Sequence, residues 1–250
     1  MDSETRKSRL SRISTSWTTL AQAHGGVEPQ ARAARLAFIQ RYQYAAYRYL
    51  LGAVRNPDTA DDLFQEFALR FMRGDFRRAD PQRGRFRDYL KTTLYHLVVD
   101  HFKQKRKRPL PLDTAVAEPA GEAWGPAEAE EQFIHSWREE LLARAWSALG
   151  ADERQSGHPH FTVLKFRTEN PKATSAEMAR QLTDTLRPKR PFTETGVRKM
   201  LQRARAKFAD HLLEDVAYSL GDSSTEELEQ ELIELGLLAY CRSALGRRKS

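Results

Sequence analysis

The segment of residues 109–131 constrains the fold of this chain more than any other feature. It reads PLPLDTAVAEPAGEAWGPAEAEE and is rich in Pro, Ala, Gly and Glu. Such a composition lacks the apolar pattern of a core element and is typical of a linker. The chain of 250 residues is therefore expected to fold as two small domains, one on each side of this segment.

Charge is distributed in blocks along the chain. Residues 1–108 carry a net charge of +11, residues 109–150 a net charge of −6, and residues 151–216 a net charge of +4. Two basic blocks that flank an acidic one predict two surfaces that meet a polyanion. The overall net charge of +7 at pH 7 favours nucleic acid as that partner.

Apolar residues recur at helical spacing along most of the chain, whereas strand signals are almost absent. Helices are expected at 30–54, 59–73, 87–105 and 128–149, with Asp58 as the N-cap of the second. The inward face of the first is expected to hold Leu36, Ile39, Tyr47, Leu50, Leu51 and Val54. We interpret the chain as an all-α protein with two small helical domains, a flexible linker and a C-terminal helix. The expected divisions are an N-terminal tail with a short helix (1–28), a first domain (29–108), the linker (109–131), a second domain (132–220) and a helical extension (221–250).

Several function classes find no support in the sequence. No apolar run approaches the ~18 residues of a membrane span, and the basic N-terminus has no apolar signal region. The single cysteine, Cys241, fits a reducing cytoplasm. No glycine-rich phosphate loop and no nucleophile motif is present, so neither enzymatic activity nor a cofactor is expected. His158 and His160 near Asp152 and Glu153 suggest a metal at first sight, but no motif places a third ligand, and no metal is expected.

The stretch TADDLFQEFALRF at residues 59–71 has two different faces when it is wound into a helix. One side collects Ala60, Phe64, Phe67 and Phe71, which is the pattern of a buried face. The opposite side collects Asp62, Gln65, Glu66 and Leu69. On the residues alone, this acidic stripe is either a solvated face or a docking face for a basic partner.

Aromatic and basic side chains are interleaved between residues 76 and 103. This arrangement is typical of a surface for single-stranded nucleic acid, because bases stack on rings at roughly 1–3 kcal/mol each while cations hold the backbone. The alternative is that most of the rings belong to a core, and we assign Phe86, Leu90 and Leu94 to packing in either case. The interleaved residues are Phe76, Arg77, Arg78, Arg83, Arg85, Phe86, Arg87, Tyr89, Lys91, Tyr95, Phe102 and Lys103.

Residues 174–207 have a helix–turn–helix pattern. A capping box of Thr174 and Glu177 begins the first helix, and Thr193 caps the second. In helix–turn–helix proteins the second helix enters the major groove, where Arg and Gln suit base edges. The alternative is an ordinary amphipathic helix with a solvated basic face. The turn TDTLRPKRP is longer than the usual three or four residues.

Together these stretches resemble bacterial RNA polymerase sigma factors of the extracytoplasmic-function type, the compact two-domain members of the sigma-70 family. ADDLFQEFALRFMR is similar to region 2.2 of these factors. FRDYLKTTLYHLVVDHFKQKRKR resembles regions 2.3 and 2.4, and FTETGVRKMLQRARAKF resembles the recognition helix of region 4.2. TSWTTLAQAHGG at 15–26 also resembles the start of a subgroup.

The resemblance implies a cytoplasmic sigma factor that binds core RNA polymerase, recognises and melts promoter DNA, and initiates transcription. The implied partners are the coiled coil of the largest polymerase subunit, the polymerase flap, promoter DNA and an anti-sigma factor. The implied polymerase-binding residues are Asp61, Asp62, Gln65, Glu66 and Leu69. The implied minus-ten residues are Phe76, Arg77, Arg78, Arg83, Arg85, Arg87, Tyr89, Lys91, Tyr95, His96 and Lys103. The implied minus-thirty-five residues are Thr193, Glu194, Thr195, Arg198, Lys199, Gln202 and Arg203.

Two features depart from the family pattern, and one other function stays open. His96 stands where many relatives have Asn, and the helix after residue 220 lies beyond the minimal pattern. Its stripe of Leu228, Leu232, Leu235 and Leu238 offers a surface for docking on either domain. The other function is a helix–turn–helix regulator that binds duplex DNA through residues 174–207 without polymerase.

Overall fold

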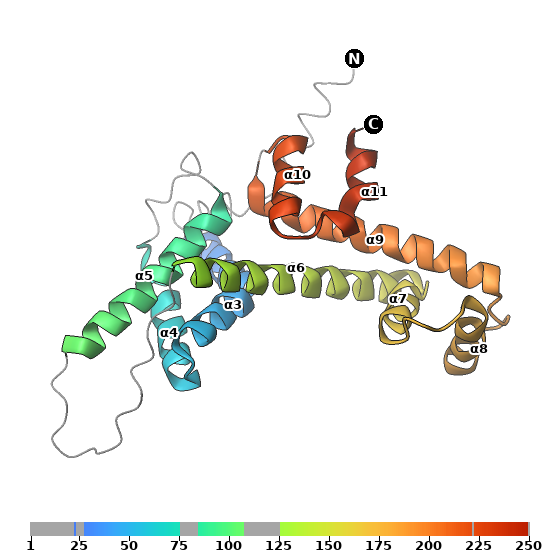
Figure 1. The fold of residues 1–250 in the computed structure, drawn as a ribbon, viewed down its shortest axis with the longest axis horizontal. Helices are drawn as coiled ribbons and strands as arrows, with labels where there is room; N and C mark the ends of the chain where they lie inside the picture. Colours follow the sequence, from blue (N-terminus) through green and yellow to red (C-terminus); the bar gives the residue numbers. More distant parts are fainter. Residues whose placement is uncertain (1–22, 24–27, 76–84, 108–125, 222, 250) are drawn as a thin grey trace. The chain divides into compact units, whose positions relative to one another are not determined.

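The computed structural model describes residues 23, 28–75, 85–107, 126–221 and 223–249. Within these ranges the chain is helical and contains no strand, so the all-α prediction is confirmed (Figure 1). The helices are α3 (Glu28–Val54), α4 (Pro57–Arg73), α5 (Phe86–Lys107), α6 (Pro126–Ser156), α7 (His160–Glu169), α8 (Ser175–Leu186), α9 (Glu194–Leu220), α10 (Thr225–Glu234) and α11 (Leu238–Lys249).

The chain divides into two compact units. Unit 1 consists of residues 1–140 and 217–223, and unit 2 consists of residues 141–216 and 224–250. Helix α6 begins at Pro126, within the range that its composition assigns to a linker, and its first half belongs to unit 1. The expected tail helix and most of the expected linker lie outside the described residues.

The core of unit 1 is built largely from aromatic rings. Phe38 of α3 stacks on Phe71 of α4 with ring centroids 4.2 Å apart, and it meets Phe86 of α5 edge-on at 5.5 Å. The assignment of Phe86, Leu90 and Leu94 to packing is confirmed, since all three are buried, and Leu97 and Val98 of α5 are buried with them. Fully buried rings of this kind bury large apolar areas and contribute further through their geometry.

The predicted inward face of α3 is wrong by about one position. Leu36 is 49% exposed, and Ile39, Tyr47, Leu51 and Val54 are only partly buried. Leu50 is the one predicted residue that is fully buried, and the rest of the buried stripe consists of Phe38, Tyr42, Ala45, Ala46, Tyr49 and Ala53. The prediction favoured aliphatic residues, whereas this core takes the tyrosine rings Tyr42 and Tyr49 and packs small alanines beside them.

Helix α4 is bounded by strong local signals. Asn56 is its N-cap rather than Asp58: the backbone of Asn56 is extended (φ −136°, ψ 119°), and its side-chain oxygen accepts a hydrogen bond from the Thr59 N–H at 2.8 Å. Pro57 then suits the first helical position, where no N–H is needed. Gly74 ends the helix in the left-handed conformation at φ 88°.

Unit 2 contains the second half of α6, helices α7 and α8, most of α9, and the pair α10 and α11. Its buried residues include Leu149, Val163, Met178, Leu182, Val197, Leu201 and Leu212. An ion pair joins Arg144 of α6 to Asp215 of α9 at 3.1 Å.

The C-terminal extension forms two helices rather than the single one expected. Gly236 adopts φ 66° between them, and α10 and α11 pack against each other (Figure 1). Leu228, Leu232 and Leu235 are buried as the stripe predicted. The buried Cys241 approaches the carbonyl of Ala209 on α9 at 3.9 Å, and burial raises the pKa of its thiol to about 12.

None of the helices in the described ranges combines the length and the apolar character that crossing a membrane demands.

Candidate polymerase and nucleic-acid interfaces

Helix α4 buries one face and exposes the acidic stripe that its sequence predicts. Ala60, Phe67 and Phe71 are buried as predicted, whereas Phe64 is only partly buried and Leu63 is buried instead. On the outer side, Asp61, Asp62 and Gln65 are exposed, and Leu69 is 50% exposed. Glu66 is partly exposed and forms an ion pair with Arg70 at 2.7 Å. The helix thus presents a negative surface around one accessible leucine, which suits a basic partner with an apolar contact point.

Asp61 has a second role at the edge of this stripe. Burial, together with the charge and the hydrogen bond of Asp61, raises the pKa of the Tyr47 hydroxyl on α3. The ring of Tyr47 meets Phe64 edge-on at 6.5 Å. These contacts join α4 to α3 at the edge of the acidic stripe.

Helix α5 carries the described part of the predicted minus-ten surface. His96 and Lys103 are exposed, whereas Arg85, Tyr89, Lys91 and Tyr95 are partly buried. Arg87 is only 4% exposed, so its side chain lies inside unit 1 rather than on the surface. Burial raises the pKa of the Tyr89 hydroxyl to about 12. Phe76, Arg77, Arg78 and Arg83 lie outside the described residues.

The first half of α6 packs on unit 1 through two aromatic residues. The ring of Trp137 stacks on Tyr42 of α3 at 5.4 Å, and Phe133 meets Tyr49 edge-on at 5.5 Å. Trp137 is 1% exposed and Phe133 is fully buried. The aromatic core of unit 1 therefore includes residues of α6 that follow the segment of linker composition.

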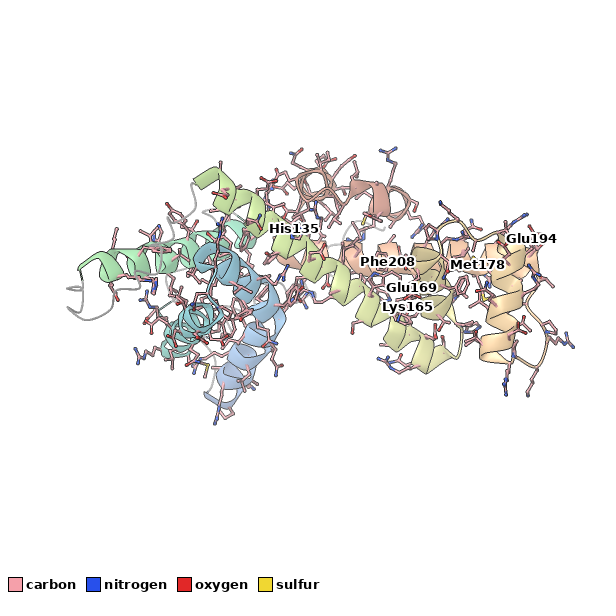
Figure 2. The ribbon with its side chains drawn as sticks, turned by 60° about the horizontal axis from the view of Figure 1, so that its bottom comes forward. His135, Lys165, Glu169, Met178, Glu194 and Phe208 are labelled. Carbon is pink, nitrogen blue, oxygen red and sulfur yellow. The ribbon has the colours of Figure 1, made fainter. Side chains whose placement is uncertain are left out.

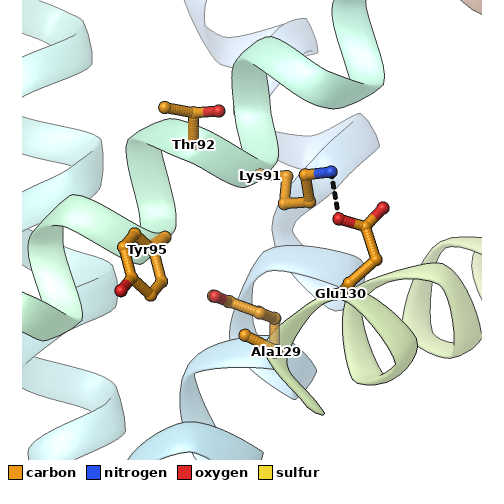
Figure 3. A pocket seen from close by; sticks show the side chains of 6 residues that line it. Lys91, Thr92, Tyr95, Ala129 and Glu130 are labelled. Carbon is orange, nitrogen blue, oxygen red and sulfur yellow. Dashed lines mark hydrogen bonds and ion pairs between the residues drawn. The ribbon is translucent and has the colours of Figure 1, made fainter. Parts of the chain in front are cut away.

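The same part of α6 forms a small pocket with α5. The pocket has a volume of about 160 Å³ and is lined by Tyr49, Lys91, Thr92, Tyr95, Ala129 and Glu130. The Lys91 ammonium contacts the Glu130 carboxylate at 2.5 Å (Figure 3) and also lies 3.4 Å from Asp88. Burial, followed by the nearby Tyr95 and Glu130, raises the pKa of Tyr49 to about 12. Lys91, a predicted strand-binding cation, is thus already engaged by carboxylates.

In unit 2, α8 and α9 are two capped helices that follow one another in the segment with the helix–turn–helix pattern. The Thr174 hydroxyl accepts from the Glu177 N–H at 3.2 Å, and the Glu177 carboxylate accepts from the Thr174 N–H at 2.7 Å, which confirms the capping box. Thr193 caps α9 by accepting from the Gly196 N–H at 3.0 Å. Met178, labelled on α8 in Figure 2, is fully buried.

The first turns of α9 expose the residues that the sequence places toward DNA. Val197, Leu201 and Ala204 are buried. The exposed residues are Thr193, Glu194, Thr195, Arg198, Lys199, Gln202 and Arg203. Arg198 pairs with Glu194 one turn earlier (Glu194 is labelled in Figure 2). The exposed face thus combines phosphate-binding cations with groups that can read base edges.

The residues that suggested a metal have other contacts. Asp152 accepts from Lys207 at 2.8 Å and lies 3.1 Å from His211. The Glu153 carboxylate accepts from the backbone N–H and the hydroxyl of Thr162 at the start of α7. In the ranges that the structure covers, no group of three or more His, Cys, Asp or Glu side chains is arranged to hold a metal.

Unit 1 is thus a helical domain with an exposed acidic stripe on α4 and with His96 and Lys103 exposed on α5. Residues 38–108 match the family model described as Sigma-70 region 2. A sigma-70 region 2 domain is therefore present, and the match supports membership of the sigma-70 family and a sigma factor role in transcription initiation. Core RNA polymerase and promoter DNA are the partners that this domain implies. No curated protein and no solved structure matches the chain.

Sequence reasoning missed the part of this site that α6 supplies. Ala129, Glu130, Phe133 and Trp137 pack against the domain that was expected to end at residue 108. Phe133 and Trp137 stand four residues apart, which places them on one face of a helix. This aromatic pair, directly after the acidic linker composition, was the signal that could have identified the contact.

Proposed function

We propose that this chain is a sigma factor of the extracytoplasmic-function type that works in the cytoplasm. The acidic stripe of α4 docks on the coiled coil of the largest subunit of core RNA polymerase. Helix α5 and the loop before it open the minus-ten element and hold the displaced strand. Helix α9 binds the minus-thirty-five element as duplex DNA.

The observation that carries this proposal is the exposure of the acidic stripe within the region 2 match. Around it the first 108 residues carry a net charge of +11, yet Asp61, Asp62 and Gln65 stand exposed beside the half-exposed Leu69. A face with reversed charge in a basic domain is best explained by a second partner that is itself basic. Complementary charge would also speed the encounter.

The proposal divides the work between protein and DNA contacts. Lys103 and His96 are exposed on α5, where cations and rings suit a single strand. The exposed cations of α9 suit duplex phosphate and base edges. No bond is made or broken by the chain itself, since its contribution is to position polymerase and to stabilise the opened DNA.

Binding to core RNA polymerase tests the proposal directly. The double variant Asp62→Lys with Glu66→Lys reverses two charges on the stripe and is expected to abolish a complex that the unaltered chain forms. Its helix content should stay unchanged, because Asp62 is exposed and the Glu66–Arg70 pair contributes only about 0.2–0.5 kcal/mol.

A matched control carries the same charge change on another surface of unit 1. Glu131 and Glu139 are exposed on α6, so Glu131→Lys with Glu139→Lys should still bind core polymerase. Native-like affinity in the α4 variant would contradict the proposed docking face. Binding of duplex DNA by a chain that never binds polymerase would favour the regulator instead.

A further inference from the structure

The turn between α8 and α9 exposes three cations that have no structural use in the fold. Arg187, Lys189 and Arg190 are all exposed. None of their side chains makes an ion pair or hydrogen bond with another residue that the structure describes. By contrast, Arg198 on the neighbouring helix is paired with Glu194.

The turn is held in one conformation by Thr183 on α8. Its hydroxyl donates to the Ala179 carbonyl at 2.7 Å and accepts from the Phe192 N–H at 2.9 Å. Its own carbonyl accepts from the Arg187 N–H at 2.9 Å. Thr183 thus bonds both ends of the segment 187–192, which contains the three cations, to α8.

Arg187 adopts a left-handed backbone conformation, which favours glycine over arginine. It ends α8 in the left-handed region at φ 44° and ψ 54°. Helices commonly end this way with glycine, which has no Cβ to clash. An arginine here carries strain without any structural contact for its guanidinium, and such an outlier is a reason to look for a function of the side chain.

We infer that Arg187, Lys189 and Arg190 form a phosphate-binding turn that contacts the backbone of duplex DNA beside the groove entered by α9. The inference rests on the proposed duplex binding by α9. Arg190 stands three positions before Thr193, and three steps of extended chain span at most roughly 10 Å. The major groove is about 12 Å wide, so cations this near the first turn of α9 reach the phosphates along its edge. The length of the turn, unusual for the motif, provides this reach.

Arg187→Gly tests the inference because it separates stability from binding. Glycine relieves the backbone strain, so the midpoint of thermal unfolding should not fall. Duplex binding should nevertheless weaken. Each phosphate contact contributes about 0.9 to the steepness with which log affinity falls against log salt concentration. Loss of one contact should therefore lower duplex affinity about eightfold at about 0.1 M salt. Lys189→Gln with Arg190→Gln should lower the slope by about 1.8.

Arg55→Gly is the matched control. Arg55 is exposed and also has a positive φ, 52°, but it follows α3 in unit 1. The control removes the same charge and the same kind of strain, and it should leave duplex affinity within about twofold. The assay is fluorescence anisotropy of the full chain on a labelled random-sequence duplex, measured across a range of salt concentrations.

The outcomes separate this inference from the proposed function. An unaltered chain that fails to bind the duplex at low salt would overturn both the duplex binding by α9 and this inference. If Gln202→Ala with Arg203→Ala weakens binding while Arg187→Gly binds like the unaltered chain, the inference alone is wrong. If Arg187→Gly and Arg55→Gly lose the same amount of duplex affinity, the loss depends only on net charge. That result would likewise overturn the inference.

Discussion

The contact between Lys91 and Glu130 predicts that α6 weakens the hold of α5 on single-stranded DNA. The two charged atoms are 2.5 Å apart, with the Lys91 side chain 21% and the Glu130 side chain 46% exposed. A strand phosphate that uses Lys91 must displace Glu130, and pairs this near the surface contribute about 0.2–1 kcal/mol. Since 1.4 kcal/mol is tenfold, Glu130→Gln should tighten strand binding by up to about fivefold.

The assay is fluorescence anisotropy of the full chain on a labelled single-stranded oligonucleotide, with Glu131→Gln as the control. Glu131 is exposed on the next position of α6 and loses the same charge. Its effect on the strand is screened over about 8 Å at physiological salt, so the change should stay below about twofold. In a chain that already carries Lys91→Gln, the further change Glu130→Gln should no longer tighten strand binding, as a double-mutant cycle requires. Equal effects of the two glutamate variants would refute the competition.

Two further predictions concern stability. Trp137→Ala should destabilise unit 1 by about 3–5 kcal/mol, because the ring is 1% exposed and stacks on Tyr42; chemical denaturation measures this, and an unchanged free energy of unfolding would place α6 outside that core. The hydrogen bond from Lys207 lowers the pKa of Asp152, with His211 adding to the effect. The folded-state pKa lies below the unfolded value of about 3.9, so this stabilisation is present above that pH and is lost as the pH falls through the folded-state pKa. In Asp152→Asn, the free energy of unfolding should therefore fall less steeply as the pH is lowered below about 4. The same steepness as in the unaltered chain would contradict this.

The elements with strong local signals were predicted well from the sequence, apart from the N-cap of α4, which is Asn56 and not Asp58. The α4 region has a proline at its start, a glycine at its end and a clean division into buried and exposed faces. The capping box of Thr174 and Glu177 begins α8 as expected. These features depend on neighbours within one or two turns, so sequence reasoning reaches them without knowledge of the tertiary structure.

The features that depend on distant contacts were predicted poorly. The inward face of α3 depends on which of its residues contact the rings of α4, α5 and α6. Tyr42 and Tyr49 are buried, whereas Leu36 is exposed, and Tyr42 contacts the rings of Phe86 and Trp137. The placement of Trp137 with unit 1 depends on the same rings. Composition made residues 126–131 look like linker, because the apolar partners that hold the first turns of α6 come only later in the helix.

The position of α6 changes how the acidic segment of the chain is understood. Glu130 lies where the linker composition and the expected helix at 128–149 overlap, and in the structure it is helical and contacts Lys91, a cation of α5. The aromatic contacts of Phe133 and Trp137 hold that helix in unit 1 far more strongly than a single ion pair would. Strand binding can therefore displace the Glu130 carboxylate from Lys91 without detaching α6. With this combination of a strong apolar anchor and a weak ionic contact, the proposed strand binding would free the charge of Lys91 while unit 1 stays folded.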